Sequence, residues 1–132
     1  MIYKVVIDAN VWIKYARAKD INPLLSRFTT YNLLPVTNNY LLTEIHDALV
    51  DNNWMKENQA DKIISFIKKI TLFTTGQVIY RISPDPKDNY LFDLAIQNNC
   101  VFVISDDLDL VDFKLKPVPV HTSNWFLKKF SV

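Results

Sequence analysis

The sequence contains a single glycine, Gly76, among its 132 residues. Phosphate-binding loops and dinucleotide fingerprints need several glycines at fixed spacing, because the backbone must turn sharply and approach the phosphates closely. Both kinds of nucleotide site are therefore excluded. A serine nucleophile elbow, which also requires flanking glycines, is excluded for the same reason.

Cysteine is equally scarce, since Cys100 is the only one. No disulfide can form within the chain, and a thiolate zinc site would lack its partners. The two histidines, His46 and His121, do not have the i, i+4 spacing of a helical zinc site. We expect each to be a partly exposed or packed imidazole, and the scarcity of cysteine favours a reducing, cytoplasmic setting.

Long apolar runs are also missing. The opening segment has a very short apolar stretch before Asp8 and no small-residue cleavage site, so we expect a strand there rather than a signal peptide. No stretch is long enough for a membrane span. The composition is 49% hydrophobic and 22% charged, which is typical of a globular chain. A length of 132 residues predicts one domain over 1–132.

Acidic residues are unevenly distributed, although the formal net charge is only +1. Half of the 14 acidic residues lie between positions 85 and 112, and the remaining chain is basic. Twelve of the 14 are aspartate and two are glutamate, whereas glutamate is the better residue for a solvated helix. Short-armed carboxylates suit helix caps, turns and metal sites.

Apolar segments predict strands and helices in alternation. Strands are predicted at residues 5–7, 33–36, 78–82, 100–104 and 118–121. Helices are predicted over 11–18, 24–28, from 39, over 56–72, from 85 and from 123. Asn22 is expected to cap the second helix before Pro23, and the fourth is expected to turn its isoleucines and Phe66 inward. This order indicates an α/β/α sandwich of three layers with a central parallel sheet.

Acidic side chains follow the two most apolar of these strands. Asp8 comes directly after residues 5–7, and Asp106 and Asp107 follow residues 100–104 after Ser105. The carboxyl ends of parallel strands meet at one edge of a sheet, where α/β folds bind ligands. We therefore expect these carboxylates to meet there.

Some of the acidic residues also have a purely structural explanation. Asp8 and Asp85 could cap the helices that follow them, and Asp88 could favour a helix N-terminus through the dipole. Glu44 lies in an apolar helix on the face shared with Leu41, so we expect it to be partly buried and to need a partner.

Three further acids, Asp106, Asp107 and Asp109, could form a turn cluster. Adjacent carboxylates repel one another unless a cation or water separates them, so we expect only one or two to point into the site. Carboxylates at two strand ends, one helix N-terminus and one helix turn are hard to explain as independent caps. They are the hard oxygen ligands that Mg²⁺ or Mn²⁺ prefers.

Four segments then carry a family resemblance: VVIDANVW, YLLTEI, DPKDNYLFDLA and VFVISDDLDL. They occur in the order and spacing seen in PIN-domain ribonucleases, and the resemblance covers essentially the whole chain. The D-x-N opening and the D-P-x-D-N segment are similar to the subgroup described as toxin components of toxin–antitoxin modules. The resemblance implies a Rossmann-like topology, an RNA substrate, a cognate antitoxin and a homodimer.

By this resemblance Asp8, Glu44, Asp88 and Asp107 match the acidic, metal-binding quartet of the family. Asn10 matches its supporting polar residue, we expect Ser105 to support the site as well, and Asp109 is the alternative fourth ligand. The chain has Asn98-Asn99 where a glycine is common, and asparagine can serve there by adopting a left-handed conformation. Asp106 stands where a small or basic residue is common, which leaves the choice among the three acids open.

The reaction that follows is metal-assisted hydrolysis of phosphodiester bonds in RNA. Lys14, Arg17 and Lys87 are candidates to bind flanking phosphates, although a solvated surface is an ordinary role for each. Tyr90 and Trp12 could stack on unpaired bases, and core packing is an equal alternative for both.

Two other classes of protein fit the sequence less well. A receiver or phosphatase domain would use a strand-end aspartate as phosphate acceptor, but the strand ends here in D-A-N, which lacks the adjacent acids or the D-x-D that these proteins need. A non-catalytic module with a PIN-like fold would bind nucleic acid or a partner without cleavage. All four candidate ligands are present, so loss of chemistry is not indicated.

Overall fold

The computed structural model describes residues 1–75 and 89–132. Its elements in chain order are β1 (Tyr3–Ile7), α1 (Ala9–Arg17), α2 (Asn22–Tyr31), β2 (Leu33–Thr37), α3 (Asn39–Asp51), α4 (Glu57–Ile70), β3 (Leu72–Phe73), α5 (Asn89–Gln97), β4 (Val103–Ile104), α6 (Leu108–Val111), β5 (Val120–His121) and α7 (Ser123–Lys129). The strand predicted at 78–82, the helix start predicted at Asp85, and the candidates Lys87 and Asp88 lie outside the described residues.

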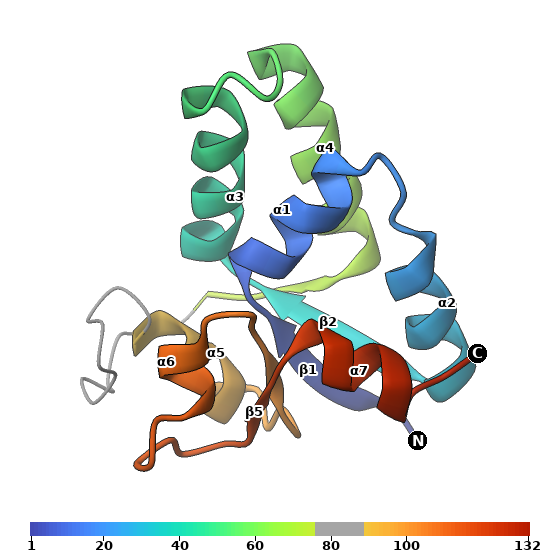
Figure 1. The fold of residues 1–132 in the computed structure, drawn as a ribbon, viewed down its shortest axis with the longest axis vertical. Coiled ribbons are helices and arrows are strands. Elements are labelled where there is room, and N and C mark those ends of the chain that lie inside the picture. The colour runs from blue at the N-terminus through green and yellow to red at the C-terminus, as the bar shows by residue number, and fades with distance from the viewer. Residues whose placement is uncertain (76–88) are drawn as a thin grey trace.

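The strands form one parallel sheet in the order β3-β2-β1-β4-β5. Figure 1 shows α1, α3 and α4 on one side of this sheet and α5 on the other. The α/β/α sandwich with a central parallel sheet, predicted from the alternation of segments, is confirmed.

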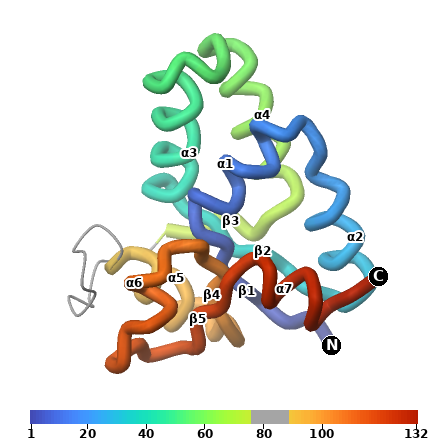
Figure 2. Tube along the Cα trace, viewed as in Figure 1, coloured from blue at the N-terminus to red at the C-terminus, as the bar shows by residue number. Residues whose placement is uncertain are grey.

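The central strand, β1, explains why the core forms where it does. Val5, Val6 and Ile7 are completely buried, because β2 and β4 pair with the two edges of β1 while helices cover both faces. The tube in Figure 2 shows β1 next to β4, and Ile7 pairs with Ile104 in that ladder. The residues that follow these two strands are therefore brought to the same edge of the sheet.

Helices α2 and α7 lie side by side although they are far apart in the sequence (Figure 1). The Arg27 guanidinium donates a hydrogen bond of 3.1 Å to the carbonyl oxygen of Leu127. The rings of Phe28 and Phe126 pack with their centroids 6.4 Å apart. This contact joins the last helix to the first half of the chain.

The fourth helix differs from its prediction in two ways. It ends at Ile70 instead of continuing to residue 72, because Thr71 is extended and its hydroxyl donates to the Ile67 carbonyl oxygen. Leu72 then enters β3, a strand of two residues that is too short for a sequence pattern to reveal. Phe66 was expected to point inward, but 41% of its surface is exposed.

Two asparagines were assigned roles in helix termini. Asn22 is the first residue of α2 rather than its cap; Ile21 holds the cap position, and the Asp20 carboxylate accepts from the Asn22 backbone N–H. Asn99, with a φ of 55°, adopts the left-handed conformation expected for the turn after α5. Among the described residues, no helix combines the length and the apolar character that crossing a membrane would require.

Candidate active site

Asp8 lies at the carboxyl end of β1 and is 5% exposed. It caps α1, since its Oδ1 accepts a hydrogen bond of 2.7 Å from the Ala9 backbone N–H. The Asp8 N–H donates to the Ile104 carbonyl oxygen at 2.8 Å, which fixes the end of β1 against β4. The capping role considered from the sequence is confirmed, but it occupies only one carboxylate oxygen.

The second oxygen of Asp8 joins a polar network that reaches across to the end of β4. Its Oδ2 accepts from the Ser105 hydroxyl at 2.7 Å and from the Asn10 side-chain amide at 3.3 Å. The Asn10 amide also reaches the Ser105 hydroxyl at 3.3 Å, and its carbonyl oxygen accepts from the Asp106 backbone N–H. Asn10 and Ser105 therefore lie beside Asp8, as expected for residues that support it.

The environment of Asp8 disfavours its charged form. Burial raises the pKa of the carboxyl from 3.8 to about 6, with the Ser105 hydrogen bond acting in the opposite direction. The negative charges of Glu44 and Asp107 raise the pKa further, so both carboxylates lie near Asp8. Repulsion among neighbouring acids is typical of sites that bind a cation.

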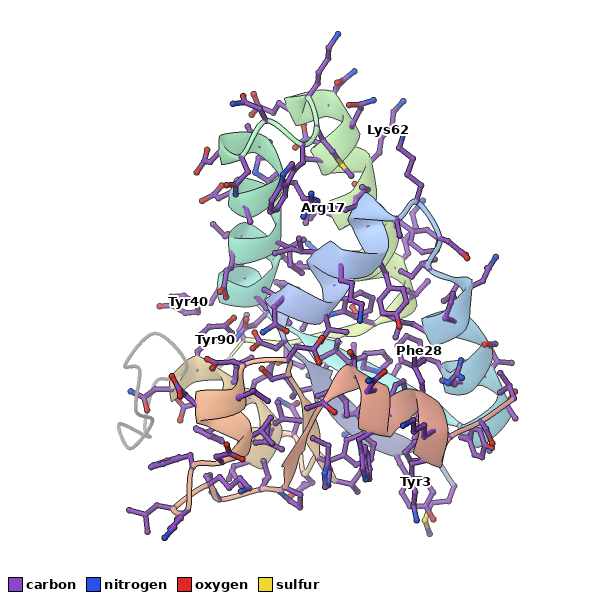
Figure 3. The ribbon with its side chains drawn as sticks, in the orientation of Figure 1. Tyr3, Arg17, Phe28, Tyr40, Lys62 and Tyr90 are labelled. Carbon is purple, nitrogen blue, oxygen red and sulfur yellow. The ribbon has the colours of Figure 1, made fainter. Side chains whose placement is uncertain are left out.

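Glu44 lies on α3 and is exposed, so the expected partial burial is wrong. It does have a polar partner, since the Tyr90 hydroxyl of α5 donates a hydrogen bond to Glu44 Oε2. Figure 3 shows Tyr90 near the end of α3 where that helix begins. Glu44 is therefore an exposed carboxylate bonded to Tyr90, whereas Asp8 is buried.

The three acids after β4 have different neighbours. Asp106 accepts hydrogen bonds of 2.8 Å from both the backbone N–H and the hydroxyl of Ser123, which ties it to the start of α7. Asp107 caps α6 by accepting from the Asp109 N–H at 3.0 Å, and its own N–H donates to Ser105. Of the three, Asp107 is the one whose charge is among the main causes that raise the pKa of Asp8.

Within residues 1–75 and 89–132, no three histidine, cysteine or acidic side chains lie close enough together to hold a metal ion. The fourth acid of the quartet, Asp88, is outside these residues, so the sequence-predicted set is not described in full. The structure therefore brings Asp8, Glu44 and Asp107 into one neighbourhood without metal-ligand spacing among them.

The basic candidates Lys14 and Arg17 both lie in the last turn of α1 but have different neighbours. Lys14 Nζ is 3.3 Å from the Ser123 hydroxyl, which places Lys14 beside Asp106 at the acidic edge. Arg17 stacks on the Trp54 ring, with Cζ 3.7 Å from its centroid. Arg17 is the last residue of α1, a helix of nine residues, so its backbone lies about 14 Å from that of Asp8 along the helix axis. Phosphate binding by either residue stays a prediction.

The two aromatic candidates, Trp12 and Tyr90, lie in different environments. Trp12 is 1% exposed, so it is a core residue and cannot stack on a base without unfolding its surroundings. Tyr90 is partly buried and stacks on Tyr40, whose ring centroid lies 6.0 Å away at an interplanar angle of 26°. The sequence did not identify Tyr40 as a site residue, although its position four residues before Glu44 placed both on one face of a helix.

Both histidines have the kind of environment that we expected. His121 stacks on Trp125 with ring centroids 3.7 Å apart, and burial lowers the pKa of His121. His46 is partly exposed, and its Nε2 lies 2.9 Å from an Asp61 carboxylate oxygen of α4.

The fold and the acidic edge define a class of α/β proteins in which carboxylates gather where the strands of a parallel sheet end. A family model described as the PIN domain matches residues 4–109, and the chain therefore belongs to the PIN-domain family. PIN domains are generally nucleases and typically use divalent metal ions. A search of curated proteins found no match to this chain.

The chemistry of the donors fits a divalent cation. Asp8, Glu44 and Asp107 offer oxygen atoms only, which are the ligands that hard cations prefer. A positive charge among them would also reverse the two electrostatic causes that raise the pKa of Asp8.

Proposed function

We propose that this chain is an endoribonuclease that hydrolyses phosphodiester bonds in RNA with Mg²⁺ or Mn²⁺. The observation that carries the proposal is the position of Asp8, a buried carboxylate at the end of β1, near the charges of Glu44 and Asp107 in a PIN domain. Asp88 completes the quartet by the match of its sequence segment, and Asp109 is the alternative to Asp107.

Residues of the chain prepare the site before RNA arrives. Ser105 and the Ala9 N–H hold the Asp8 carboxylate in one orientation, which limits the reorganisation needed when a cation or substrate binds. When bound, a divalent ion supplies an activated water and neutralises charge on the phosphoryl oxygens. Lys14, beside the acidic edge, and Lys87 and Arg17 supply positive charge for phosphates flanking the scissile bond.

The family subgroup that the sequence resembles gives the biological setting of the proposal. We place the enzyme in the cytoplasm as the toxin of a toxin–antitoxin module, acting as a homodimer until a cognate antitoxin inhibits it. Induced expression of the wild-type chain should arrest growth, whereas Asp8→Asn should not. If expression of active wild-type enzyme leaves growth unaffected, the toxin role is wrong, while the proposal of nuclease activity still stands.

The test of the activity is cleavage of a labelled single-stranded RNA by purified protein with Mg²⁺ or Mn²⁺. EDTA should abolish cleavage, and Asp8→Asn should reduce it by at least 100-fold, on the order of what loss of a central electrostatic group costs. Asp106→Asn is the matched control, because this carboxylate binds Ser123 and should be dispensable for cleavage. Folded protein that binds RNA but never cleaves it would favour the non-catalytic module.

A further inference from the structure

An exposed aromatic pair adjoins the acidic site. Tyr40 projects from the first turn of α3 and is 62% exposed, and one face of its ring lies on Tyr90. Tyr90 in turn donates its hydroxyl to Glu44. Figure 3 shows the two tyrosines next to each other, where the start of α3 meets the start of α5.

The stack holds Tyr40 in place while leaving most of its surface open to solvent. A ring so exposed contributes little to the core, because the hydrophobic gain scales with the area removed from water. A preorganised aromatic side chain loses little conformational entropy when a ligand packs on it. The arrangement therefore suits binding better than it suits folding.

The lining of the hollow beside Tyr40 indicates the kind of group that fits there. The hollow has a volume of ≈ 420 Å³ and is lined by Asn39, Tyr40, Thr43, Glu44 and Asp47. Among the described residues that line the hollow, two are acidic and none is basic, so their charges disfavour a phosphate there. A neutral aromatic ring is not repelled, and Asn39 and Thr43 offer hydrogen-bonding groups to its edge.

We propose that Tyr40, backed by Tyr90, is a stacking platform for one unpaired base of single-stranded RNA beside the phosphate bound at the acidic cluster. This inference rests on the proposed function, and it adds that the substrate must be locally unpaired. Every base presents a face to an aromatic ring, but bases in an A-form helix are stacked on one another and cannot reach Tyr40. The platform therefore selects for strandedness more than for sequence.

The spacing of Tyr40 and Glu44 along α3 places the proposed platform beside the acidic site. Tyr40 and Glu44 are four residues apart on a helix, so their side chains are neighbours on one face. A base on Tyr40 thus lies next to a carboxylate of the acidic site. Its own phosphate is repelled by Asp47 in the hollow and extends toward the cation expected at Asp8 and Glu44.

The test is a binding cycle in the full-length Asp8→Asn protein with Mg²⁺, which keeps the RNA intact. A short single-stranded RNA is scanned with one abasic position at a time, and affinity is measured by fluorescence anisotropy. With Tyr40 present, we expect one abasic position to weaken binding by about 5- to 150-fold. In Tyr40→Ala, intact RNA should bind more weakly by a similar factor, and the same abasic position should have no further effect.

Tyr40→Phe is the matched control, since it keeps the ring and removes only the hydroxyl, and it should bind RNA as Tyr40 does. A base analogue that fluoresces when unstacked, placed at the sensitive position, should brighten in Tyr40→Ala. Abasic penalties that persist unchanged in Tyr40→Ala would overturn the platform, as would equal affinity for a fully paired duplex of the same sequence.

The two proposals fail in distinguishable ways. Wild-type cleavage of RNA without coupling between Tyr40 and any base overturns the platform and leaves the nuclease in place. Coupling in the binding cycle without cleavage by wild-type protein supports the platform and overturns the nuclease. Absence of both RNA binding and RNA cleavage by the wild-type protein with Mg²⁺ overturns both.

Discussion

The Ser105 hydroxyl donates a hydrogen bond of 2.7 Å to Oδ2 of Asp8, a residue 97 positions earlier in the chain. Both side chains are buried, so this bond is not weakened by competing water. It lowers the pKa of Asp8 against the effect of burial. The bond thus connects the ends of β1 and β4 and helps keep Asp8 ionised.

Removing this hydroxyl should affect Asp8 specifically. We expect Ser105→Ala to raise the pKa of Asp8 above about 6 and to cost about 2 kcal/mol of stability at neutral pH, the usual cost of losing a hydrogen bond to a charged group. Ser123→Ala is the matched control, because it removes another buried hydroxyl that bonds Asp106 instead. Equal changes in the pH dependence of unfolding for both variants would contradict the assignment.

The metal-free protein should be less stable at neutral pH than at acid pH because of Asp8. The folded-state pKa, about 6, lies above the unfolded value of 3.8. The folded state therefore binds more protons between these values, and stability falls as the pH rises through them, then stays level. The loss attributable to Asp8 is roughly 3 kcal/mol, at 1.36 kcal/mol for each pKa unit.

Asp8→Asn isolates this effect, because the amide does not titrate while the other groups remain. Chemical unfolding in EDTA at several pH values should show the wild type losing stability relative to the variant between about pH 4 and pH 6. A difference between the two proteins that does not change with pH would show that burial leaves Asp8 unperturbed.

Substitution of Asp106 should affect stability alone, whereas substitution of Asp107 should affect metal binding. Asp106→Asn should cost about 1 kcal/mol, because its carboxylate bonds the start of α7, and should leave Mn²⁺ affinity unchanged. Asp107→Asn should weaken Mn²⁺ binding at least tenfold, as measured by calorimetry, since its charge reaches Asp8. If Asp109→Asn weakens binding instead, the fourth ligand is Asp109.

The Tyr90 hydroxyl should matter for the position of Glu44. Tyr90→Phe removes the donor to Glu44 while keeping the ring under Tyr40, and we expect Mn²⁺ affinity and kcat each to fall about tenfold. Tyr40→Phe removes the hydroxyl of the adjacent ring and should change neither quantity. Similar losses in both variants would mean that removing either hydroxyl from this surface has the same effect, and that the hydrogen bond to Glu44 is not the cause.

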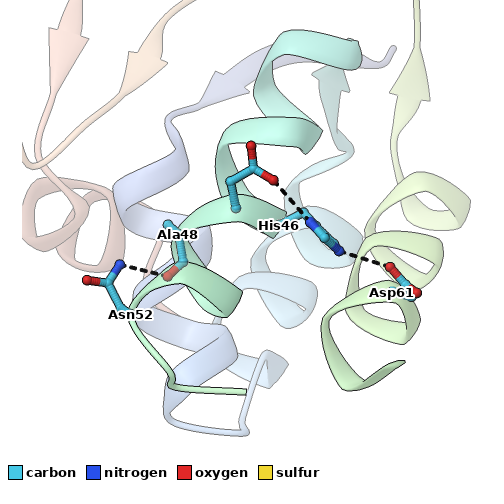
Figure 4. A network of polar contacts seen from close by, with 5 residues as sticks. His46, Ala48, Asn52 and Asp61 are labelled. Atoms are coloured by element: carbon cyan, nitrogen blue, oxygen red, sulfur yellow. Dashed lines mark hydrogen bonds and ion pairs between the residues drawn. The ribbon is translucent and has the colours of Figure 1, made fainter. Parts of the chain in front are cut away.

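His46 should stabilise the pairing of α3 and α4 at acid pH. Figure 4 shows its imidazole between two carboxylates, with Nδ1 3.2 Å from Asp47 and Nε2 2.9 Å from Asp61. These partners raise the pKa of His46 above 6.5, so the stabilisation is complete below 6.5 and is lost as the pH rises through the higher folded value.

Because both carboxylates are exposed, the contribution should not exceed about 1 kcal/mol. Thermal unfolding of the wild type and of His46→Gln at pH 5.5 and at pH 8.5, on either side of the His46 titration, measures this contribution. The loss of stability caused by the substitution should be larger at pH 5.5 than at pH 8.5. Destabilisation by the substitution that is equal at the two pH values would indicate packing rather than charge.

The sequence by itself determined the layers of the fold and the position of Asp8. A β-branched run with no polar residue, such as Val5 to Ile7, is stable only where both faces of a strand are covered. The acidic residue that ends such a run must then lie at the carboxyl edge of a parallel sheet, wherever the other strands fall. The left-handed turn at Asn99 follows from local backbone sterics in the same way.

The tertiary structure decided which neighbouring side chains share the site. Asp106 and Asp107 are adjacent in sequence, and their different directions depend on Ser123 and Ser105, which the order of β4 and β5 brings close. Tyr40 and Tyr90 are 50 residues apart, and they stack only because α3 and α5 begin near each other. Local patterns encode periodicity and caps, whereas such contacts depend on how the whole sheet is assembled, so the sequence alone did not reveal them.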